Sequence, residues 1–213
     1  MNRRQAAAAI VMLSACLVGG DEVVGVAVEY FRRKPIDLAR PPADVPFPLR
    51  VKNYVRHREG SCFHVSTQVA LRWADQGAIA DNWRQSFGGG ASTSDIARIL
   101  DRYKIPYKRT HIVGYGPNED GNVEILDYAH NHRLAAAIHY FRGHAINFLG
   151  WVEKDGQAMA CLLDNNRPQE FIFVEKNQFL WNWRNRYHGG AIVPLVQPLP
   201  PLPYDPRDFL EKP

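Results

Sequence analysis

The distribution of proline divides this chain of 213 residues into a central segment and two extensions. Five prolines fall within residues 34–49 and seven within residues 194–213. Proline lacks a backbone N–H and fixes φ, so residues 34–49 cannot form a regular helix or a central strand, and the C-terminal stretch favours polyproline II. We therefore predict a Pro-rich linker over residues 21–49, one folded domain over residues 50–195 and a Pro-rich tail over residues 196–213.

The composition of the chain is that of a globular protein. Hydrophobic residues make up 46% of the chain and aromatic residues 11%, which is enough to form a buried core. The formal net charge is only +4, and the basic residues are scattered. A nucleic-acid surface needs basic residues clustered on one face, so the sequence predicts no nucleic-acid partner.

The first 20 residues resemble an export signal. Arg3 and Arg4 precede an apolar run over residues 6–15, which is too short for a membrane-spanning helix. Leu-Ser-Ala-Cys at residues 13–16 resembles the bacterial lipobox, in which the cysteine is lipidated and becomes the new N-terminus. The resemblance implies a signal peptide over residues 1–20 and an exported cell-envelope protein anchored to the membrane through Cys16. Plain secretion is the alternative.

The central segment begins with helical patterns. Residues 62–75 carry apolar side chains at the spacing of one helix face. Residues 92–103 begin with N-cap chemistry and continue as a second amphipathic helix. A third helix is predicted over residues 122–132.

From residue 134 onward the pattern changes from helix to strand. Lys-Asp-Gly at residues 154–156 predicts a tight hairpin between two of these strands. One more helix is predicted over residues 176–186. Helices followed by an antiparallel sheet predict an α+β domain in which N-terminal helices pack on a C-terminal sheet. The predicted strands are residues 134–141, 144–152, 157–163, 171–174 and 191–195.

Cys62 is the candidate nucleophile. It lies in the first turn of the first predicted helix, directly after Gly60 and Ser61. Free N–H groups and the positive end of the helix dipole lower the pKa of a thiol there, and the thiolate is the nucleophilic form. The Cys62 N–H can also point at the oxyanion that develops during attack on a carbonyl.

His144 is the candidate general base, because it begins a predicted strand directly after Gly143. If the hairpin turn centres near residue 155, residues 144–146 lie opposite residues 164–166. Residues 164–166 are Asp, Asn and Asn. Any of the three can accept the imidazole N–H and stabilise the imidazolium.

Three short motifs together resemble the papain-like cysteine peptidases. They are Gly-Ser-Cys-Phe at residues 60–63, Gly-His-Ala at residues 143–145 and Leu-Asp-Asn-Asn at residues 163–166. The compact arrangement is similar to the bacteriocin-processing branch and its bacterial relatives. The resemblance implies a papain-like fold and a Cys62–His144 ion pair. It also implies that Asp164 orients the histidine, with Asn165 as the alternative third member.

The residues before Cys62 depart from the pattern of that family. A glutamine several residues before the cysteine usually completes the oxyanion hole, whereas here Asn53 carries the first preceding amide. Arg56 and Asn53 are the candidate replacements. Loss of one oxyanion donor lowers the rate by about 100- to 1000-fold, so a full peptidase rate depends on one of these two residues.

Two functional hypotheses follow from these residues. The first is a thiol hydrolase that cleaves peptide or isopeptide bonds of a protein or peptide substrate without a cofactor. The second is a catalytically inactive papain-like binding or assembly protein, anchored by its N-terminus and docked to a partner through its Pro-rich tail. No metal site is predicted, because His130, His132 and His139 have no cysteine or carboxylate at metal-ligand spacing.

Overall fold

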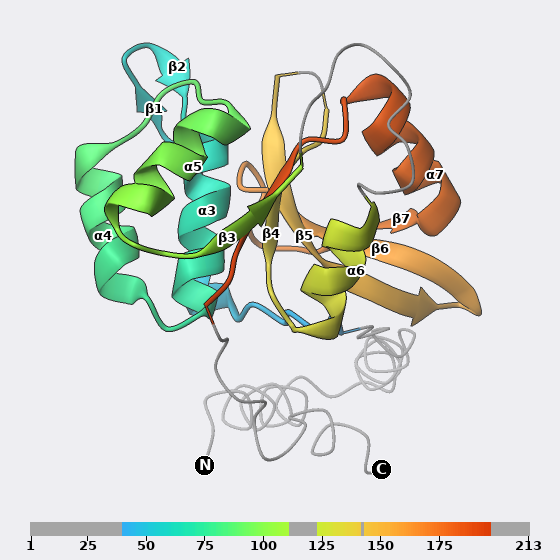
Figure 1. Ribbon diagram of the computed structural model, residues 1–213. Helices are drawn as coiled ribbons and strands as arrows, with labels where there is room; N and C mark the ends of the chain where they lie inside the picture. Colours follow the sequence, from blue (N-terminus) through green and yellow to red (C-terminus); the bar gives the residue numbers. More distant parts are fainter. Residues whose placement is uncertain (1–39, 111–122, 142, 197–213) are drawn as a thin grey trace, which may run out of the picture. The chain divides into compact units, whose positions relative to one another are not determined.

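A six-stranded antiparallel sheet with the strand order β3-β8-β4-β5-β6-β7 runs through the computed structural model (Figure 1). The structure describes residues 40–110, 123–141 and 143–196. The predicted signal segment with Cys16, and all but the first residue of the predicted tail, lie outside these ranges. The strands of the sheet are β3 (Tyr107–Arg109), β4 (Ala136–His139), β5 (Ala145–Lys154), β6 (Gln157–Leu163), β7 (Ile172–Glu175) and β8 (Ala191–Pro194).

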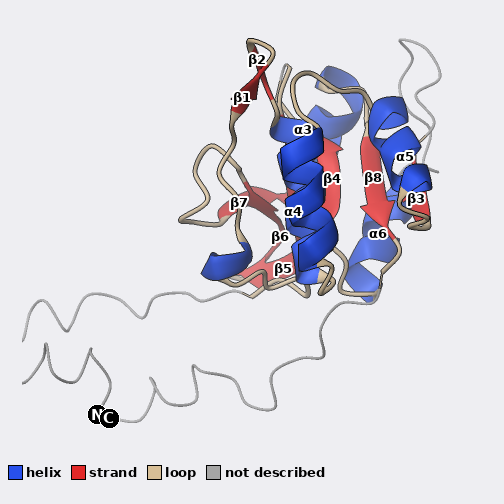
Figure 2. Cartoon of the chain, turned by 90° about the vertical axis from the view of Figure 1, so that its left-hand side faces the viewer, coloured by secondary structure: helices blue, strands red, loops and turns tan. Residues whose placement is uncertain are grey.

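Helices cover both faces of this sheet (Figures 1 and 2). Alternate residues of β4 show the division, since Ala136 and Ile138 pack in one buried cluster and Ala137 in another. The structure therefore confirms the mixed α+β class and its antiparallel sheet. One face carries α3 (Cys62–Trp73), α4 (Gly77–Ser86) and α5 (Thr93–Arg102), and the other carries α6 (Val123–Asn131), α7 (Lys176–Trp181) and the π-helix η3 (Asn182–Arg186).

The predicted helices and strands are largely confirmed. Ser92 and Asp95 form a reciprocal capping box at the start of α5. Asp155 and Gly156 both have positive φ, 53° and 73°, in the two-residue turn that joins β5 to β6. This backbone is the type I′ geometry that an Asp-Gly pair favours.

Several short elements were not predicted. They are α4, β3 and a two-stranded hairpin of β1 (Val55–Arg56) and β2 (Glu59–Gly60) that directly precedes α3. Only Ala80 and Trp83 of α4 are buried, so its sequence carries no continuous apolar face. Strands of two or three residues are too short to show an alternating pattern.

The end of the predicted linker is part of the folded unit. Ala43 and Val45 are fully buried against α3 and the β5–β6 hairpin. The Ala43 N–H donates a hydrogen bond of 3.1 Å to the carbonyl of Leu149 in β5. The packed domain therefore includes Ala43 and Val45 of the predicted linker and does not begin as late as residue 50. Within the described ranges, no helix has both the length and the hydropathy needed to cross a membrane.

Candidate active site

Cys62 is the first residue of α3 and is half-buried. The preceding residue, Ser61, makes no side-chain cap on this helix, because its hydroxyl instead accepts the Gly89 N–H at 2.8 Å. The first N–H groups of a helix have no acceptor within the helix itself. The Phe63 N–H is directed at the Cys62 thiol, and the Ala145 N–H donates to its sulfur at 3.3 Å.

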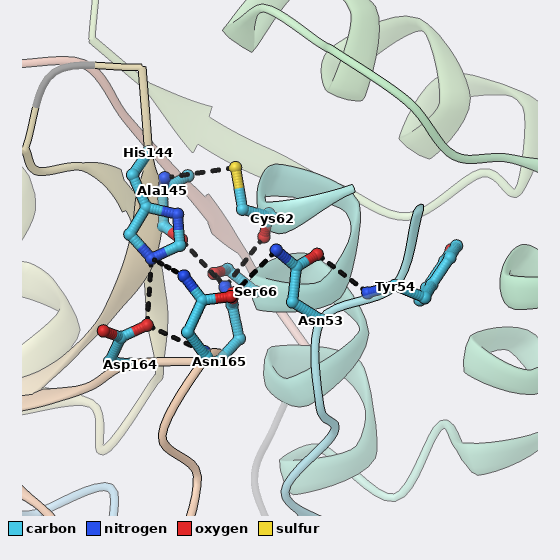
Figure 3. A network of polar contacts seen from close by, with 9 residues as sticks. Asn53, Tyr54, Cys62, Ser66, His144, Ala145, Asp164 and Asn165 are labelled. Carbon is cyan, nitrogen blue, oxygen red and sulfur yellow. Dashed lines mark hydrogen bonds and ion pairs between the residues drawn. The ribbon is translucent and has the colours of Figure 1, made fainter. Parts of the chain in front are cut away.

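His144 precedes the first residue of β5, where the chain turns back from β4. The Tyr140 N–H donates to the His144 carbonyl at 3.1 Å, which closes this turn and fixes the histidine backbone. The His144 Nε2 atom lies 2.9 Å from the Asp164 Oδ1 atom, and only 16% and 14% of the two side chains are exposed. The other ring nitrogen, Nδ1, lies on the side of Cys62 (Figure 3), and the interaction with Cys62 contributes to the raised pKa of His144.

These contacts shift the pKa values of all three groups. Burial raises the pKa of Cys62, but the His144 hydrogen bond and charge, with the Ala145 and Phe63 N–H groups, bring it below its ordinary value. Burial lowers the pKa of His144, whereas the contacts with Asp164 and Cys62 raise it to about 9. Burial also raises the pKa of Asp164, and the bonds from His144 and the Asn166 N–H outweigh this effect and lower it. The lowered pKa of Cys62 and the raised pKa of His144 both shift the pair toward a thiolate beside an imidazolium.

Asp164 rather than Asn165 is the partner of the histidine. The Asn165 side chain is buried and turned toward α3, where its Nδ2 atom lies 3.1 Å from the Cys62 carbonyl oxygen and 3.0 Å from the Ser66 hydroxyl. The same Nδ2 atom lies 2.8 Å from the Ala145 carbonyl oxygen. The alternative that placed Asn165 as the third member is therefore wrong, and Asn165 instead ties the start of α3 to the start of β5.

A chain of amides leads from the β1–β2 hairpin to the imidazole (Figure 3). The Tyr54 N–H donates to Asn53 Oδ1 at 2.9 Å, and Asn53 Nδ2 donates to Asn166 Oδ1 at 3.1 Å. The Asn166 Nδ2 atom then lies 3.3 Å from His144 Nε2. Because a backbone N–H can only donate, it fixes the orientation of the Asn53 amide and, through that amide, of Asn166.

The two oxyanion candidates have different surroundings. An added Cβ at Gly60 would lie 3.7 Å from Asn53 Nδ2, so the Asn53 amide lies beside the segment that leads into Cys62. Arg56 instead donates from Nη1 to the Gln85 carbonyl oxygen at 2.8 Å and to the Phe87 carbonyl oxygen at 3.3 Å, at the C-terminal end of α4. The structure therefore brings Asn53 to the site and directs the Arg56 guanidinium away from it.

Neighbouring groups of the same chemical types have structural roles. His64 is buried, accepts a 3.1 Å hydrogen bond from Trp83 Nε1 at Nδ1, and has a pKa lowered to about 4, mainly by burial. Cys161 is fully buried in β6, and burial raises the pKa of its thiol. Among the described residues, no group of three or more His, Cys, Asp or Glu side chains is placed to hold a metal ion.

Two participants in this site were not predicted. The Ala145 N–H reaches the sulfur only because β5 begins beside the N-terminus of α3, which no local pattern reveals. Asn166 was considered only as one of three possible partners of His144, and it lies in the turn after β6, where no local pattern distinguishes it from Asp164 and Asn165.

Comparison of the chain with protein-family models, curated proteins and solved structures finds no match. The class of site is therefore defined by its own geometry. A half-buried thiol at a helix N-terminus, an imidazole and a carboxylate converge from α3, the start of β5 and the end of β6 (Figure 3). Such an arrangement can activate a sulfur nucleophile and move a proton.

Proposed function

We propose that this protein is a papain-like cysteine hydrolase that cleaves peptide or isopeptide bonds. The observation that carries the proposal is the convergence of Cys62, His144 and Asp164, with the histidine between the thiol and the carboxylate. A nucleophile hydrogen-bonded to a base that a third group orients is the general pattern of covalent hydrolysis. The export-like segment over residues 1–20 supports action outside the cytoplasm.

In the proposed reaction, the Cys62 thiolate attacks the carbonyl carbon of the scissile bond. The His144 imidazolium then donates its Nδ1 proton to the leaving nitrogen, the C–N bond breaks, and a thioester remains on Cys62. Neutral His144 next takes a proton from water, which attacks the thioester and releases the carboxylic acid and the thiolate. If an amine takes the place of this water, the same residues perform acyl transfer.

The negative charge on the carbonyl oxygen needs donors in both steps. The Cys62 N–H at the start of α3 is the first proposed donor, because a first-turn N–H has no acceptor within the helix. Asn53 Nδ2 is the second, since it carries two protons and gives one of them to Asn166. Asn53 thereby takes the role that a glutamine has in the related peptidases.

The proposal is tested by alkylation of the full chain with a low concentration of iodoacetamide between pH 5 and pH 9. We expect Cys62 to react at pH 6 about 10-fold or more faster than a free thiol, whose ordinary pKa is about 8.5. His144→Ala should abolish this excess rate, and Cys62→Ala gives the background from other thiols. A Cys62 rate equal to that of a free thiol and indifferent to His144 would remove the basis for a hydrolase.

A binding or assembly protein with the same fold is the second candidate. The observation that favours it is the engagement of Arg56 at the end of α4, because the site has no glutamine before Cys62 and keeps only one of its two candidate side-chain oxyanion donors, Asn53. Slow alkylation of Cys62 together with a folded His144→Ala variant would support this candidate. Partner capture through the Pro-rich tail over residues 196–213 would then be the next measurement.

A further inference from the structure

An exposed aromatic side chain lies beside the proposed general base. Phe141 is 42% exposed, and its φ of 68° lies in the left-handed region. This conformation is unfavourable for a bulky side chain and persists only where the surrounding structure enforces it. The stability of the turn alone therefore explains neither the exposure of the Phe141 side chain nor its positive φ.

The Phe141 ring rests on other aromatic rings. Its centroid lies 4.7 Å from that of Tyr140 and 6.0 Å from that of Tyr187. Tyr140 is buried and stacks on Phe179 of α7 at 5.2 Å, which connects this group to the hydrophobic core. Phe141 and the half-buried Tyr187 thus form a supported apolar surface instead of a freely rotating side chain.

This aromatic surface adjoins the histidine ring. The His144 N–H donates to the Phe141 carbonyl oxygen at 3.3 Å, so one turn holds both residues. The two rings are nearly parallel, with an interplanar angle of 24° and centroids 6.5 Å apart. In the proposed reaction His144 protonates the leaving nitrogen, so the first residue of the leaving peptide must lie next to His144.

We propose that Phe141 and Tyr187 form an apolar subsite for a large hydrophobic or aromatic side chain on the first residue of the leaving group. The inference rests on the proposed hydrolase function and specifies its substrate. The position of the surface identifies its occupant, because the surface adjoins His144, which must donate a proton to the leaving amine. Burial of an exposed ring against an apolar partner is favourable, and aromatic pairs gain further from offset stacking.

A protective role for Phe141 predicts a different dependence of the rate on the substrate. A ring that only shields the His144–Asp164 bond from water would affect every substrate equally. A subsite discriminates between leaving groups, because it binds a large apolar side chain, whereas glycine has no side chain for it to bind. The side-chain preference of the amine partner is therefore the quantity that separates the two roles.

The test uses the partition of an acyl-enzyme between water and added amines. The full chain is acylated at Cys62 with 4-nitrophenyl acetate in the presence of phenylalaninamide or glycinamide. The ratio of N-acetyl product to acetate is measured for each amine and does not depend on the amount of active protein. We expect wild type to favour phenylalaninamide over glycinamide by about 10-fold or more.

Variants assign that preference to the aromatic surface. Phe141→Ala should bring the preference close to one, whereas Phe141→Leu should retain most of it. Phe141→Gly repeats the truncation with a residue that accepts positive φ without strain, so a folding defect of the alanine variant does not decide the result. Phe47→Ala is the matched control, since it removes a phenylalanine that is 61% exposed in the short helix η1 (Phe47–Leu49).

Two failures of this experiment are distinguishable. If ester cleavage does not depend on Cys62, as judged against Cys62→Ala, the proposed hydrolase function fails and the subsite fails with it. If cleavage depends on Cys62 but wild type shows no preference, or Phe141→Ala keeps the preference, only the subsite is overturned. A uniform slowing of both amines by Phe141→Ala would assign the ring to protection of His144 and would likewise overturn the subsite.

Discussion

Asp164→Asn is the change that most directly tests the electrostatics of the site. Asparagine has the same shape and can still accept a hydrogen bond through Oδ1, so the substitution removes mainly the charge 2.9 Å from His144 Nε2. A contacting carboxylate raises the pKa of a histidine by about 1–3 units. Because part of this bond survives, we expect the pKa of His144 to fall from about 9 by about 1–2 units.

The same change alters stability in a defined pH window. The folded pKa of His144 lies above its unfolded value of 6.5, so its contribution is complete below pH 6.5 and is lost as pH rises through about 9. Asp164 has a lowered pKa, so it remains ionised in the folded state above about pH 4. Between about pH 5 and 6.5, the loss of 1–2 pKa units corresponds to about 1.4–2.7 kcal/mol of unfolding free energy.

Two measurements check the Asp164→Asn expectation. Histidine ring resonances followed by NMR across pH give the pKa, with His144→Ala as the assignment control. Urea unfolding at pH 5.5 and pH 10, followed by tryptophan fluorescence, gives the free energy of unfolding. The reasoning is refuted if the His144 pKa moves by less than about 0.3 units, or if the destabilisation is equal at the two pH values, since only an imidazolium can lose the charge interaction.

Three further substitutions separate the roles of neighbouring polar groups. Asn165→Ala should lower the free energy of unfolding, measured in urea, by about 2–4 kcal/mol, because it removes the Nδ2 donor that contacts the Cys62 carbonyl, the Ser66 hydroxyl and the Ala145 carbonyl. A loss below about 0.5 kcal/mol would contradict this role. Asn53→Ala should lower hydrolytic turnover by about 100-fold or more while the alkylation rate of Cys62 stays within about 2-fold of wild type; equal turnover would exclude Asn53 as an oxyanion donor. Arg56→Gln should cost about 1 kcal/mol of stability in urea and leave turnover unchanged, and a large loss of turnover would restore Arg56 as a candidate.

The sequence predicts the parts of this site that begin or end regular elements. Cys62 starts an amphipathic helix, and His144 and Asp164 flank the two strands of an Asp-Gly hairpin. Their positions follow from local patterns and from one turn, so they can be predicted from sequence. The layering of helices on both faces of the sheet depends on long-range packing, and the burial of β4 on both faces was not anticipated.

The misplacement of Arg56 has one physical origin. The spacing before Cys62 brings Arg56 close to the site in sequence, but a guanidinium pairs with whatever acceptors its long side chain can reach. Those acceptors are the carbonyls at the end of α4, including Gln85, and α4 was itself not predicted. An element missing from the sequence-based description therefore explains why Arg56 and Asn53 could not be separated as oxyanion candidates from the sequence.

The choice between Asp164 and Asn165 depends on a single extra residue in β5. The hairpin pairs Lys154 with Gln157, and the register shifts by one between Phe148 and Gly150. The ladder ends at the pair of Asn147 and Leu163, so this shift sets the point from which the chain leaves β6, with Asp164 contacting His144 and Asn165 turned toward α3.

The segment assigned to the linker holds this bulge in place. The bulged residue is Leu149, whose carbonyl oxygen accepts the Ala43 N–H. The next residue, Gly150, has a φ of 131°, and an added Cβ there would lie 2.5 Å from Pro42 Cδ. The contacts of residues 42 and 43 thus bear on which side chain faces the histidine, although they lie far from it in sequence. The sequence left Asp164 and Asn165 as alternatives because neither the bulge at Leu149 nor its contacts with residues 42 and 43 follow from a local sequence pattern.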